Sequence, residues 1–437
     1  MDTVSYMRSL HPVRERSSLI LSNPQYLQHF DLNLAALDTV VDQILELIRR
    51  DYENLSEIPP HSRWRHFEAN NIKRIDPILA DWDQRSVPAI EQTRRVLDLF
   101  IVSVLLDAGA GDRYKYHPKA EPGISYTRSE ALALASLDMF LAGGFSSDPK
   151  QPLQVDSLGL AQVTTQMLAN HLQVSDSNPL NALENRCELL HSLGRVIAGS
   201  NPFFPITSGV ARPGNLIDYL VQHPSTQNGR VQMAVLWDCI GNGLCHIWPS
   251  SRTTLDGVPL GDVWKLQSLD LAMKQPNSHG TVCSDPKSAG LAAFHKLSQW
   301  LAYSCLEPIE VIMKLQIEGI ELLTGLAEYR NGGLFVDSGV LSLKPGRDGT
   351  VIKGGNGVPP RFRVDDDVVV EWRALTVALL DRVAEKVRHR LGADKHTLPL
   401  AKVLEAGTWK AGREIAAKLR PLTKGPPIEI ESDGTVF

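Results

Sequence analysis

The sequence predicts a mainly α-helical protein with minor short β elements, because helical periodicity recurs along the chain and strand patterns are scarce. Apolar residues repeat three and four positions apart in several long segments, which places them on one face of a helix. Strand patterns are confined to short runs such as 349–352 and 428–430. Hydrophobic residues make up 43% and charged residues 22% of the 437-residue chain, a globular composition that excludes disordered, collagen-like and coiled-coil proteins.

The first two helices are predicted from apolar spacing and from end signals. The segment 37–48 carries apolar residues at intervals of three, one and four, which is typical of one buried helix face. Thr-Arg-Ser-Glu at 127–130 has the pattern of a capping box and therefore predicts the start of a second helix. The glycine pair 143–144 is expected to end it.

Two further helices are predicted later in the chain. The Asn-Pro pair 178–179 predicts a helix start, with apolar residues repeating as far as Gly199. The acidic run 365–367 suits the positive end of a helix, and apolar residues then recur from 372 to 391. Gly392 is expected to close that helix.

Charge and composition also restrict partners and location. Asp plus Glu is 50 and Lys plus Arg is 45, so the net charge of −5 gives no basic face, and no nucleic-acid partner is expected. The largely apolar run 101–106, bounded by Asp98 and Asp107, is far shorter than the ~18 residues of a membrane span, so no membrane partner is expected. The first residues lack an apolar signal-peptide core, which predicts a cytoplasmic protein.

The cysteines and histidines give no metal-binding pattern. The five cysteines are scattered and are expected to be reduced thiols: Cys187, Cys239, Cys245, Cys283 and Cys305. His246 adjoins one of them, but two adjacent ligands cannot close a tetrahedral site and no matching pair lies nearby. We therefore expect no metal and no cofactor.

The first candidate site is the glycine-rich stretch from Asp107 to Asp112. Its Gly-x-Gly lacks the third glycine of a dinucleotide-binding loop, and a glycine-rich helix stop is the default interpretation. The alternative is a polar-ligand site, because two carboxylates adjoin Arg113, Tyr114 and Tyr116.

The second candidate is the segment 295–308, which begins with His295. Helical spacing places Lys296, Gln299 and Tyr303 together on one face, opposite an apolar face. The default interpretation is an amphipathic helix whose polar face is solvated, and the alternative is a ligand-binding face.

The third candidate is Leu323–Gly333, where Glu328, Tyr329 and Arg330 precede Asn-Gly-Gly. A polar turn is the default interpretation. Apolar segments on both sides favour instead a buried Glu328, and a buried carboxylate has a shifted pKa that suits acid–base chemistry.

Together these clusters resemble the uracil-catabolism protein family, named for the fourth protein of the fungal uracil-catabolism pathway. The resemblance spans nearly the whole chain, with alanine at 327 where we expect proline. It is carried by the following segments: Val102–Gly111, Tyr126–Glu130, Ile247–Pro249 with Arg252, Gly261–Trp264, His295–Trp300 and Glu328–Gly333.

Residues 96–391 are more distantly similar to the queuosine-salvage N-glycosylases. Leu326–Arg330 resembles their Phe-Ala-Asp-Tyr-Arg motif, Glu371–Arg373 resembles their Glu-Ile-Arg, and Lys296–Gln299 resembles their Lys-Arg-Ala-Gln. The acid that follows in that family falls near Ser304, with Glu307 three residues later, so the carboxylate that acts at the sugar stays open. Asn-Gly-Gly after the Glu-Tyr-Arg replaces their Val-Pro-Gln and argues against queuosine as the substrate.

The resemblance implies a helical fold related to DNA glycosylases and cleavage of a bond between ribose C1′ and nitrogen. We expect residues 1–95 to form an N-terminal helical extension and 96–437 the glycosylase-like catalytic domain, unless the two form one continuous unit. An oxocarbenium-like transition state needs a nearby carboxylate and a second group that activates water or protonates the leaving nitrogen. The available acids are Asp107, Glu307 and Glu328.

The predicted function is hydrolysis of ribosylurea, or its 5′-phosphate, to urea and the ribose product. Glu328 is assigned to the sugar hydroxyls or the leaving urea, and Asp107 or Glu307 to the position nearest C1′. The remaining expected substrate-binding residues are Arg128, Arg330 and Lys296 for a phosphate, Tyr303 and Tyr329 beside the ribose or leaving group, and Gln299, His295 and Asp112. The alternatives are a ureide or amide hydrolase acting on the opened pyrimidine and a non-catalytic binding partner in the same pathway. The sequence leaves the oligomeric state open.

Overall fold

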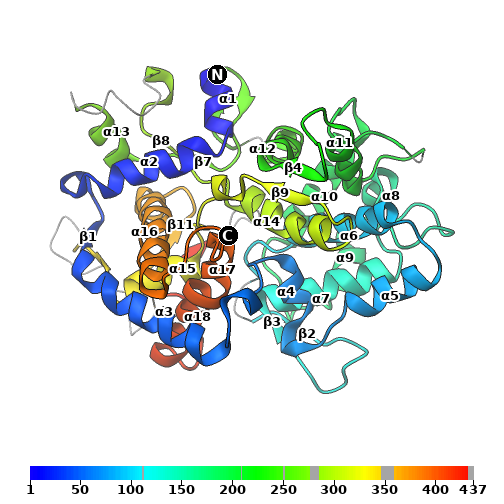
Figure 1. The fold of residues 1–437 in the computed structure, drawn as a ribbon, viewed down its shortest axis with the longest axis horizontal. Helices are drawn as coiled ribbons and strands as arrows, with labels where there is room; N and C mark the ends of the chain where they lie inside the picture. Colours follow the sequence, from blue (N-terminus) through cyan, green and yellow to red (C-terminus); the bar gives the residue numbers. More distant parts are fainter. Residues whose placement is uncertain (111–112, 208, 250, 276–284, 346–358, 432–437) are drawn as a thin grey trace. The chain divides into compact units, whose positions relative to one another are not determined.

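The structure, a computed structural model, describes residues 1–110, 113–207, 209–249, 251–275, 285–345 and 359–431. It is mainly helical, as the sequence predicts, and its strands are short and paired two by two (Figure 1). The chain divides into two compact units. Unit 1 comprises Met1–His61, Ser251–Lys296 and Glu321–Glu431, and unit 2 comprises Ser62–Ser250 and Leu297–Ile320. The predicted division at residue 95 does not coincide with a boundary between these two units, and it stays a prediction.

Unit 1 is built around a long, buried helix. Its α-helices are α1 (Thr3–Arg8), α2 (His11–Leu21), α3 (Leu37–Asp51), α13 (Gln267–Met273), α15 (Tyr329–Asp337), α16 (Asp367–Leu391), α17 (Leu400–Val403) and α18 (Trp409–Leu419). The 25-residue α16 is buried on all sides over 368–380, and α2 and α3 pack against it (Figure 1). Helix α15 packs against α18. A helix that is buried on all sides lies at the centre of a core.

Most strand pairs of unit 1 join segments that are far apart in the sequence. The antiparallel pairs are β1 (Phe30–Leu32) with β10 (Leu341–Leu343), β5 (Thr254–Leu255) with β6 (Val258–Pro259), and β7 (Val263–Lys265) with β8 (Leu291–Ala293). In a parallel pair, β11 (Arg361–Arg363) lies beside β12 (Glu429–Glu431). The second of these strands confirms the short β element predicted at 428–430.

Unit 2 is organised in the same way around α6, whose residues 96–105 are all buried. Its α-helices are α4 (Arg63–Phe67), α5 (Asp76–Gln84), α6 (Ala89–Leu105), α7 (Arg128–Leu141), α8 (Ser157–Gln162), α9 (Thr165–His171), α10 (Leu183–Ala198), α11 (Leu216–Gln222) and α12 (Met233–Trp237). Helix α14 (Lys296–Val311) begins at the last residue of a unit 1 segment and continues in unit 2. The strand pairs are β2 (Lys115–Tyr116) with β3 (Tyr126–Thr127), antiparallel, and β4 (Arg230–Gln232) with β9 (Gln316–Glu318), parallel.

The predicted helices are present, with two differences at their starts. Helix α7 forms and ends before the glycine pair, but Thr127 is the last residue of β3 and its side chain makes no capping hydrogen bond. Helix α10 begins at Leu183, later than the Asn-Pro pair, because Asn178 instead bridges the main chain of Lys115 and Gln173. The capping box and the early start were therefore wrong. The predicted strand at 349–352 lies outside the described residues.

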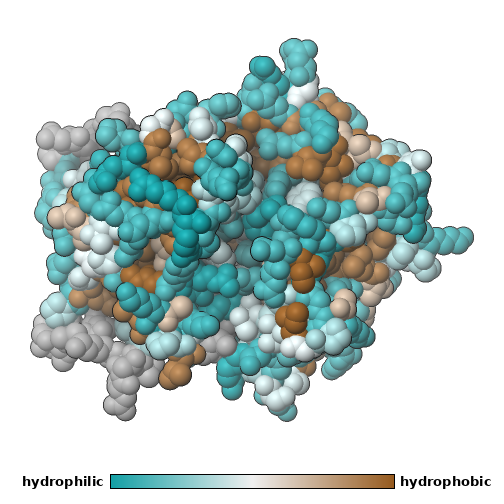
Figure 2. All heavy atoms as spheres, turned by 60° about the horizontal axis from the view of Figure 1, so that its bottom comes forward, coloured by the Kyte–Doolittle hydropathy of each residue, from teal (hydrophilic) through white to brown (hydrophobic). Residues whose placement is uncertain are grey.

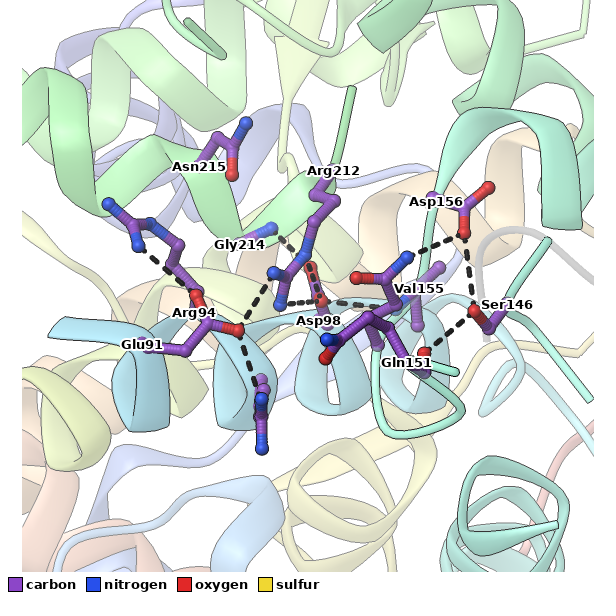
Figure 3. Close-up of polar contacts among 12 residues, drawn as sticks. Glu91, Arg94, Asp98, Ser146, Gln151, Val155, Asp156, Arg212, Gly214 and Asn215 are labelled. Carbon is purple, nitrogen blue, oxygen red and sulfur yellow. Dashed lines mark hydrogen bonds and ion pairs between the residues drawn. The ribbon is translucent and has the colours of Figure 1, made fainter. Parts of the chain in front are cut away.

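A buried ion pair anchors α6 within unit 2 (Figure 3). Arg212 donates from Nε and Nη2 to Oδ2 of Asp98 at 2.9 and 2.7 Å, and Gly214 N–H donates to Oδ1 at 2.7 Å. Val155 N–H also reaches Oδ2, at 3.0 Å, and Arg212 contacts Glu91 at 2.9 Å. Burial raises the pKa of Asp98 to about 6, although Arg212 and the backbone donors lower it. These bonds fix α6, and with it the carboxylate that follows its C-terminal end.

Within the described parts of the chain, none of the helices combines the length and apolar character of a membrane span. Figure 2 shows apolar residues on one face in several separate groups among polar ones. The described cysteines are all buried and none of them is in a disulfide, and Cys283 lies outside the described residues.

Candidate functional site

Glu328 lies at the N-terminus of α15 in unit 1 and caps that helix. Its backbone is extended, with φ of −119°, and its carboxylate accepts the N–H groups of Arg330 and Asn331, both at 2.6 Å. Carboxylates are favoured there because the first N–H groups of a helix have no partner within it. The residue is 9% exposed, so the predicted burial is confirmed while a small part of it reaches the surface.

The surroundings of Glu328 favour the protonated form of its carboxyl more than water does. Burial raises the pKa of Glu328, and this effect outweighs the backbone N–H groups of Arg330 and Asn331 and the charges of Lys296 and Arg330, which lower it. A buried acid with a raised pKa and nearby cations is a common arrangement at acid–base sites. Unit 1 therefore brings together Glu328 and Lys296, which the sequence assigned to one site.

Arg330 and Tyr329 are held by the packing of α15 against α18. The Arg330 guanidinium donates to the carbonyl of Lys424 at 2.9 Å and lies over the Tyr329 ring, 5.1 Å from its centroid. A Cβ atom on Gly412 of α18 would lie 2.2 Å from the Arg330 carbonyl oxygen, so only glycine fits there. Arg330 is thus buried and engaged with the protein, while Tyr329 is half-buried.

The start of α14 is held by a carboxylate that the sequence did not single out. Asp262, just before β7, accepts the N–H of Lys296 at 2.9 Å and the Trp264 indole N–H at 2.6 Å. Arg373 of α16 donates to both oxygens at 2.8 and 2.7 Å, and its guanidinium lies 4.0 Å from the Phe294 ring centroid. Burial alone would raise the pKa of Asp262, but Arg373 and the other donors hold it well below its usual range.

His295, which precedes α14, is buried in a strained conformation. Its φ is +48°, a left-handed value that costs a non-glycine residue about 1 to 3 kcal/mol. Its ring Nε2 lies 2.8 Å from the carbonyl oxygen of Met7, so Nε2 is the donor. Burial lowers the pKa of His295, which keeps the imidazole neutral near pH 7.

The other two candidate carboxylates belong to unit 2, and each forms an ion pair with an arginine of α4. Asp107 Oδ1 lies 2.9 Å from Arg63 Nη1, and Glu307 pairs with Arg65 and accepts a hydrogen bond from the Ser62 hydroxyl. Both acids are thus neutralised by a neighbour. The Arg-Trp-Arg-His sequence at 63–66 combines basic and aromatic residues in a short helix, which was the signal that could have indicated this role.

Arg63 organises the surroundings of Asp107. It is fully buried and donates from Nε to the Ser103 hydroxyl at 2.8 Å, and its Nη1 lies 3.3 Å from His66 Nδ1. The His66 ring meets the edge of the Trp300 ring with centroids 5.5 Å apart. This constellation of a carboxylate, a buried arginine, a histidine and an indole is polar and ordered, and it lies where the glycine-rich stretch begins.

The remaining predicted residues are placed as follows. Gln299 and Tyr303 are each 1% exposed, so the default interpretation of a solvated polar face on this helix was wrong. Both lie in unit 2, as does Arg128, which opens α7 with a φ of +57° and is half-buried. Asp112 lies outside the described residues. Within the described residues no group of three or more His, Cys, Asp or Glu side chains could hold a metal ion.

The fold and these clusters define a class, a mainly helical protein with a buried acid of raised pKa beside a lysine. The chain belongs to the family described as "Protein of unknown function (DUF1688)", whose model matches residues 6–437. It is 41% identical over 448 residues to "Uracil catabolism protein 4" of Lachancea kluyveri, covering 99% of each chain. It is 39% identical over 440 residues to "Protein urg3" of Schizosaccharomyces pombe, covering 100% of this chain and 99% of that one.

Proposed function

We propose that this protein is an N-ribohydrolase of uracil breakdown that hydrolyses ribosylurea, or its 5′-phosphate, to urea and the ribose product. The observation that carries the proposal is the buried Glu328 carboxyl of raised pKa beside Lys296. The full-length similarity to a protein named for uracil catabolism supports the assignment to this pathway. The proposal includes a fold related to DNA glycosylases and a catalytic domain over 96–437.

The reaction balances with water alone. The bond between C1′ and the urea nitrogen breaks, the water oxygen bonds to C1′, and one water proton ends on the leaving nitrogen. Positive charge develops at C1′ in the transition state, and a carboxylate nearby stabilises it. Protonation of the leaving nitrogen lowers the barrier further, and general acid–base catalysis of this kind typically contributes about 10² to 10⁴-fold.

Glu328 is proposed to bind the sugar hydroxyls or the leaving urea. Its raised pKa lets it hold a proton at a higher pH than an ordinary glutamate, which suits hydrogen bonding to a developing anion on nitrogen. Lys296 adds a positive charge near the same carboxyl. Asp107 and Glu307 stay the candidates for the position nearest C1′, and each is held by an ion pair with an arginine of α4.

The test is proton NMR of the purified protein with ribosylurea and, separately, its 5′-phosphate. Loss of the N-glycosidic C1′ proton and appearance of free ribose or ribose phosphate are expected, and the faster compound decides the phosphate question. Release of ammonia or carbon dioxide without free sugar would point to a ureide or amide hydrolase instead. Survival of both compounds at high protein concentration would remove the glycosidase proposal and favour a binding role.

A matched pair of variants tests the assignment of Glu328. Glu328→Gln is expected to abolish turnover while the circular dichroism spectrum stays native. Asp156→Asn is the control, because Asp156 is also a buried N-cap: it accepts the N–H of Gly159 of α8 at 2.7 Å, and the N–H of Ser147 in the preceding loop at 2.8 Å. Full activity of Glu328→Gln would show that the assignment is wrong.

The same assay distinguishes the roles of the two remaining acids, Asp107 and Glu307. Asp107→Asn and Glu307→Gln each remove one ion pair with α4. We expect one of them to lower kcat by at least about 100-fold, because a carboxylate beside C1′ contributes several kcal/mol in a dry site. The other should keep most of its activity. Near-normal kcat in both variants would contradict a role for either acid at C1′.

A further inference from the structure

Both carboxylate oxygens of Asp262 accept two hydrogen bonds, and the partners come from separate parts of the chain. One oxygen accepts from Arg373 and the Trp264 indole, and the other from Arg373 and the Lys296 main chain. Arg373 is 1% exposed and Asp262 8% exposed. Charge-assisted bidentate pairs of this kind fix direction as well as distance, because the two parallel bonds allow little rotation.

The main chain of Asp262 holds the turn that leads into α14. Its carbonyl oxygen accepts the N–H of Phe294 at 3.0 Å and that of His295 at 3.4 Å. The left-handed φ of His295 is maintained by these bonds and by the ring contact with the Met7 carbonyl. A strained residue persists only where its surroundings determine its conformation. The main chain at Lys296 is therefore held by Asp262 at two points. The Asp262 side chain accepts the Lys296 N–H, and the Asp262 carbonyl accepts the N–H groups of the two preceding residues.

This arrangement fixes the main-chain position of Lys296. It is half-buried, and its charge acts on the Glu328 carboxyl together with that of Arg330. A long, flexible lysine side chain can serve a site reproducibly only if its Cα is fixed, because the ammonium has no preferred direction of its own. Phe294 packs against the Arg373 guanidinium at 4.0 Å, which couples the same turn to α16.

We propose that Asp262 and Arg373 are positioning residues that hold Lys296 beside Glu328 for the reaction. The proposal rests on the proposed function, since it assigns to the pair a purpose at that site. Neither residue is expected to touch the substrate. They act through the main chain of Lys296, and Trp264 supports them by filling one lone pair of Asp262.

The experiment measures the pKa of Glu328 in the free protein by carbon NMR of labelled glutamate carboxyls, with Glu328→Gln used to assign the signal. Asp262→Asn is expected to raise that pKa, as Lys296→Met should do directly. The sign is diagnostic, because loss of a negative charge alone would lower the pKa of Glu328, whereas displacement of Lys296 raises it. The same variant should lower kcat for ribosylurea by about 100-fold with little change in KM.

Two further variants control the measurement. Asp337→Asn breaks a comparable pair, in which Arg420 donates to both Asp337 oxygens at the other end of α15, and should leave the pKa of Glu328 and kcat unchanged. Trp264→Phe removes a single bond to Asp262 and keeps an aromatic ring under Arg252, so it decides the case if Asp262→Asn does not fold. We expect it to change both readouts in the same direction, with kcat lowered by about 10-fold.

The outcomes separate this inference from the proposed function. The positioning role is overturned if the folded Asp262→Asn variant leaves the pKa of Glu328 unchanged. If Asp262→Asn does not fold, an unchanged pKa in Trp264→Phe overturns it. Either result holds whatever the activity measurement shows. A raised pKa in a protein that never cleaves ribosylurea supports the positioning role and defeats the proposed function. A raised pKa together with the kcat loss supports both.

Discussion

The stability of the protein should depend on pH through Glu328, and Glu328→Gln should remove that dependence. Since burial raises the pKa of Glu328, the native state binds its proton more tightly than the unfolded chain does. The stabilisation is fully present below the ordinary value of 4.5 and is lost as pH rises through the higher native pKa. Each tenfold difference in proton affinity between the native and unfolded states corresponds to about 1.4 kcal/mol of free energy.

The glutamine variant also changes the helix cap, and this contribution can be worked out separately. The carboxylate accepts two main-chain N–H groups with its two oxygens, at 2.6 Å each, whereas a carboxamide has a single oxygen. Loss of one cap bond costs about 1 kcal/mol against the ionised carboxylate. The protonated carboxyl, like the carboxamide, has a single carbonyl oxygen, so the two caps are nearly matched at pH 4. The free energy of unfolding of wild type minus that of Glu328→Gln should therefore be small at pH 4 and fall as pH rises towards 7.

The assay is urea unfolding followed by circular dichroism at several pH values between 4 and 7. Asp156→Asn provides the contrast, because its backbone donors outweigh burial and lower the pKa of Asp156 below 3.8. Its stabilisation is lost only as pH falls below that value, so the difference from wild type should be flat over the same range. A difference for Glu328→Gln that stays flat or grows with pH would refute the reasoning about its pKa.

Two predictions concern the packing on which the units depend. Asp98→Asn leaves Arg212 without its main partner in the core of unit 2 and should cost about 3 kcal/mol in urea unfolding, whereas Glu188→Gln at an exposed pair should change less than about 1 kcal/mol; equal effects would contradict the structural role of the buried pair. Gly412→Ala should lower the melting temperature, because its Cβ would meet the α15 main chain at 2.2 Å and overpacking costs about 1 to 3 kcal/mol. Gly199→Ala, whose nearest contact is 3.6 Å, should melt near wild type, and an equal loss there would show that the close approach at Gly412 is not the cause.

Local patterns in the sequence determined the helices and the burial of Glu328. The spacing of apolar residues over 37–48 and 372–391 specified α3 and α16, and glycine marked the end of the latter at Gly392. Flanking apolar segments were enough to place Glu328 inside, because burial of neighbours draws a short polar turn inward. Helix starts were less predictable: Asn178 found main-chain partners from distant residues, which compete with capping.

Only the tertiary structure decided which charges meet. Asp262 and Arg373 are 111 positions apart, and Asp107 and Glu307 find their partners on α4, so no local period could reveal these pairs. Spacing on α14 gave the right helix but the wrong environment, since periodicity reports which residues share a face and not what covers that face. The sequence by itself thus determined the helical class and the candidate acids, whereas long-range packing decided which acid has a raised pKa and which form ion pairs with arginine. The physical reason is that a pKa depends on burial and on charges within a few ångströms, and those neighbours are assembled only when the chain folds.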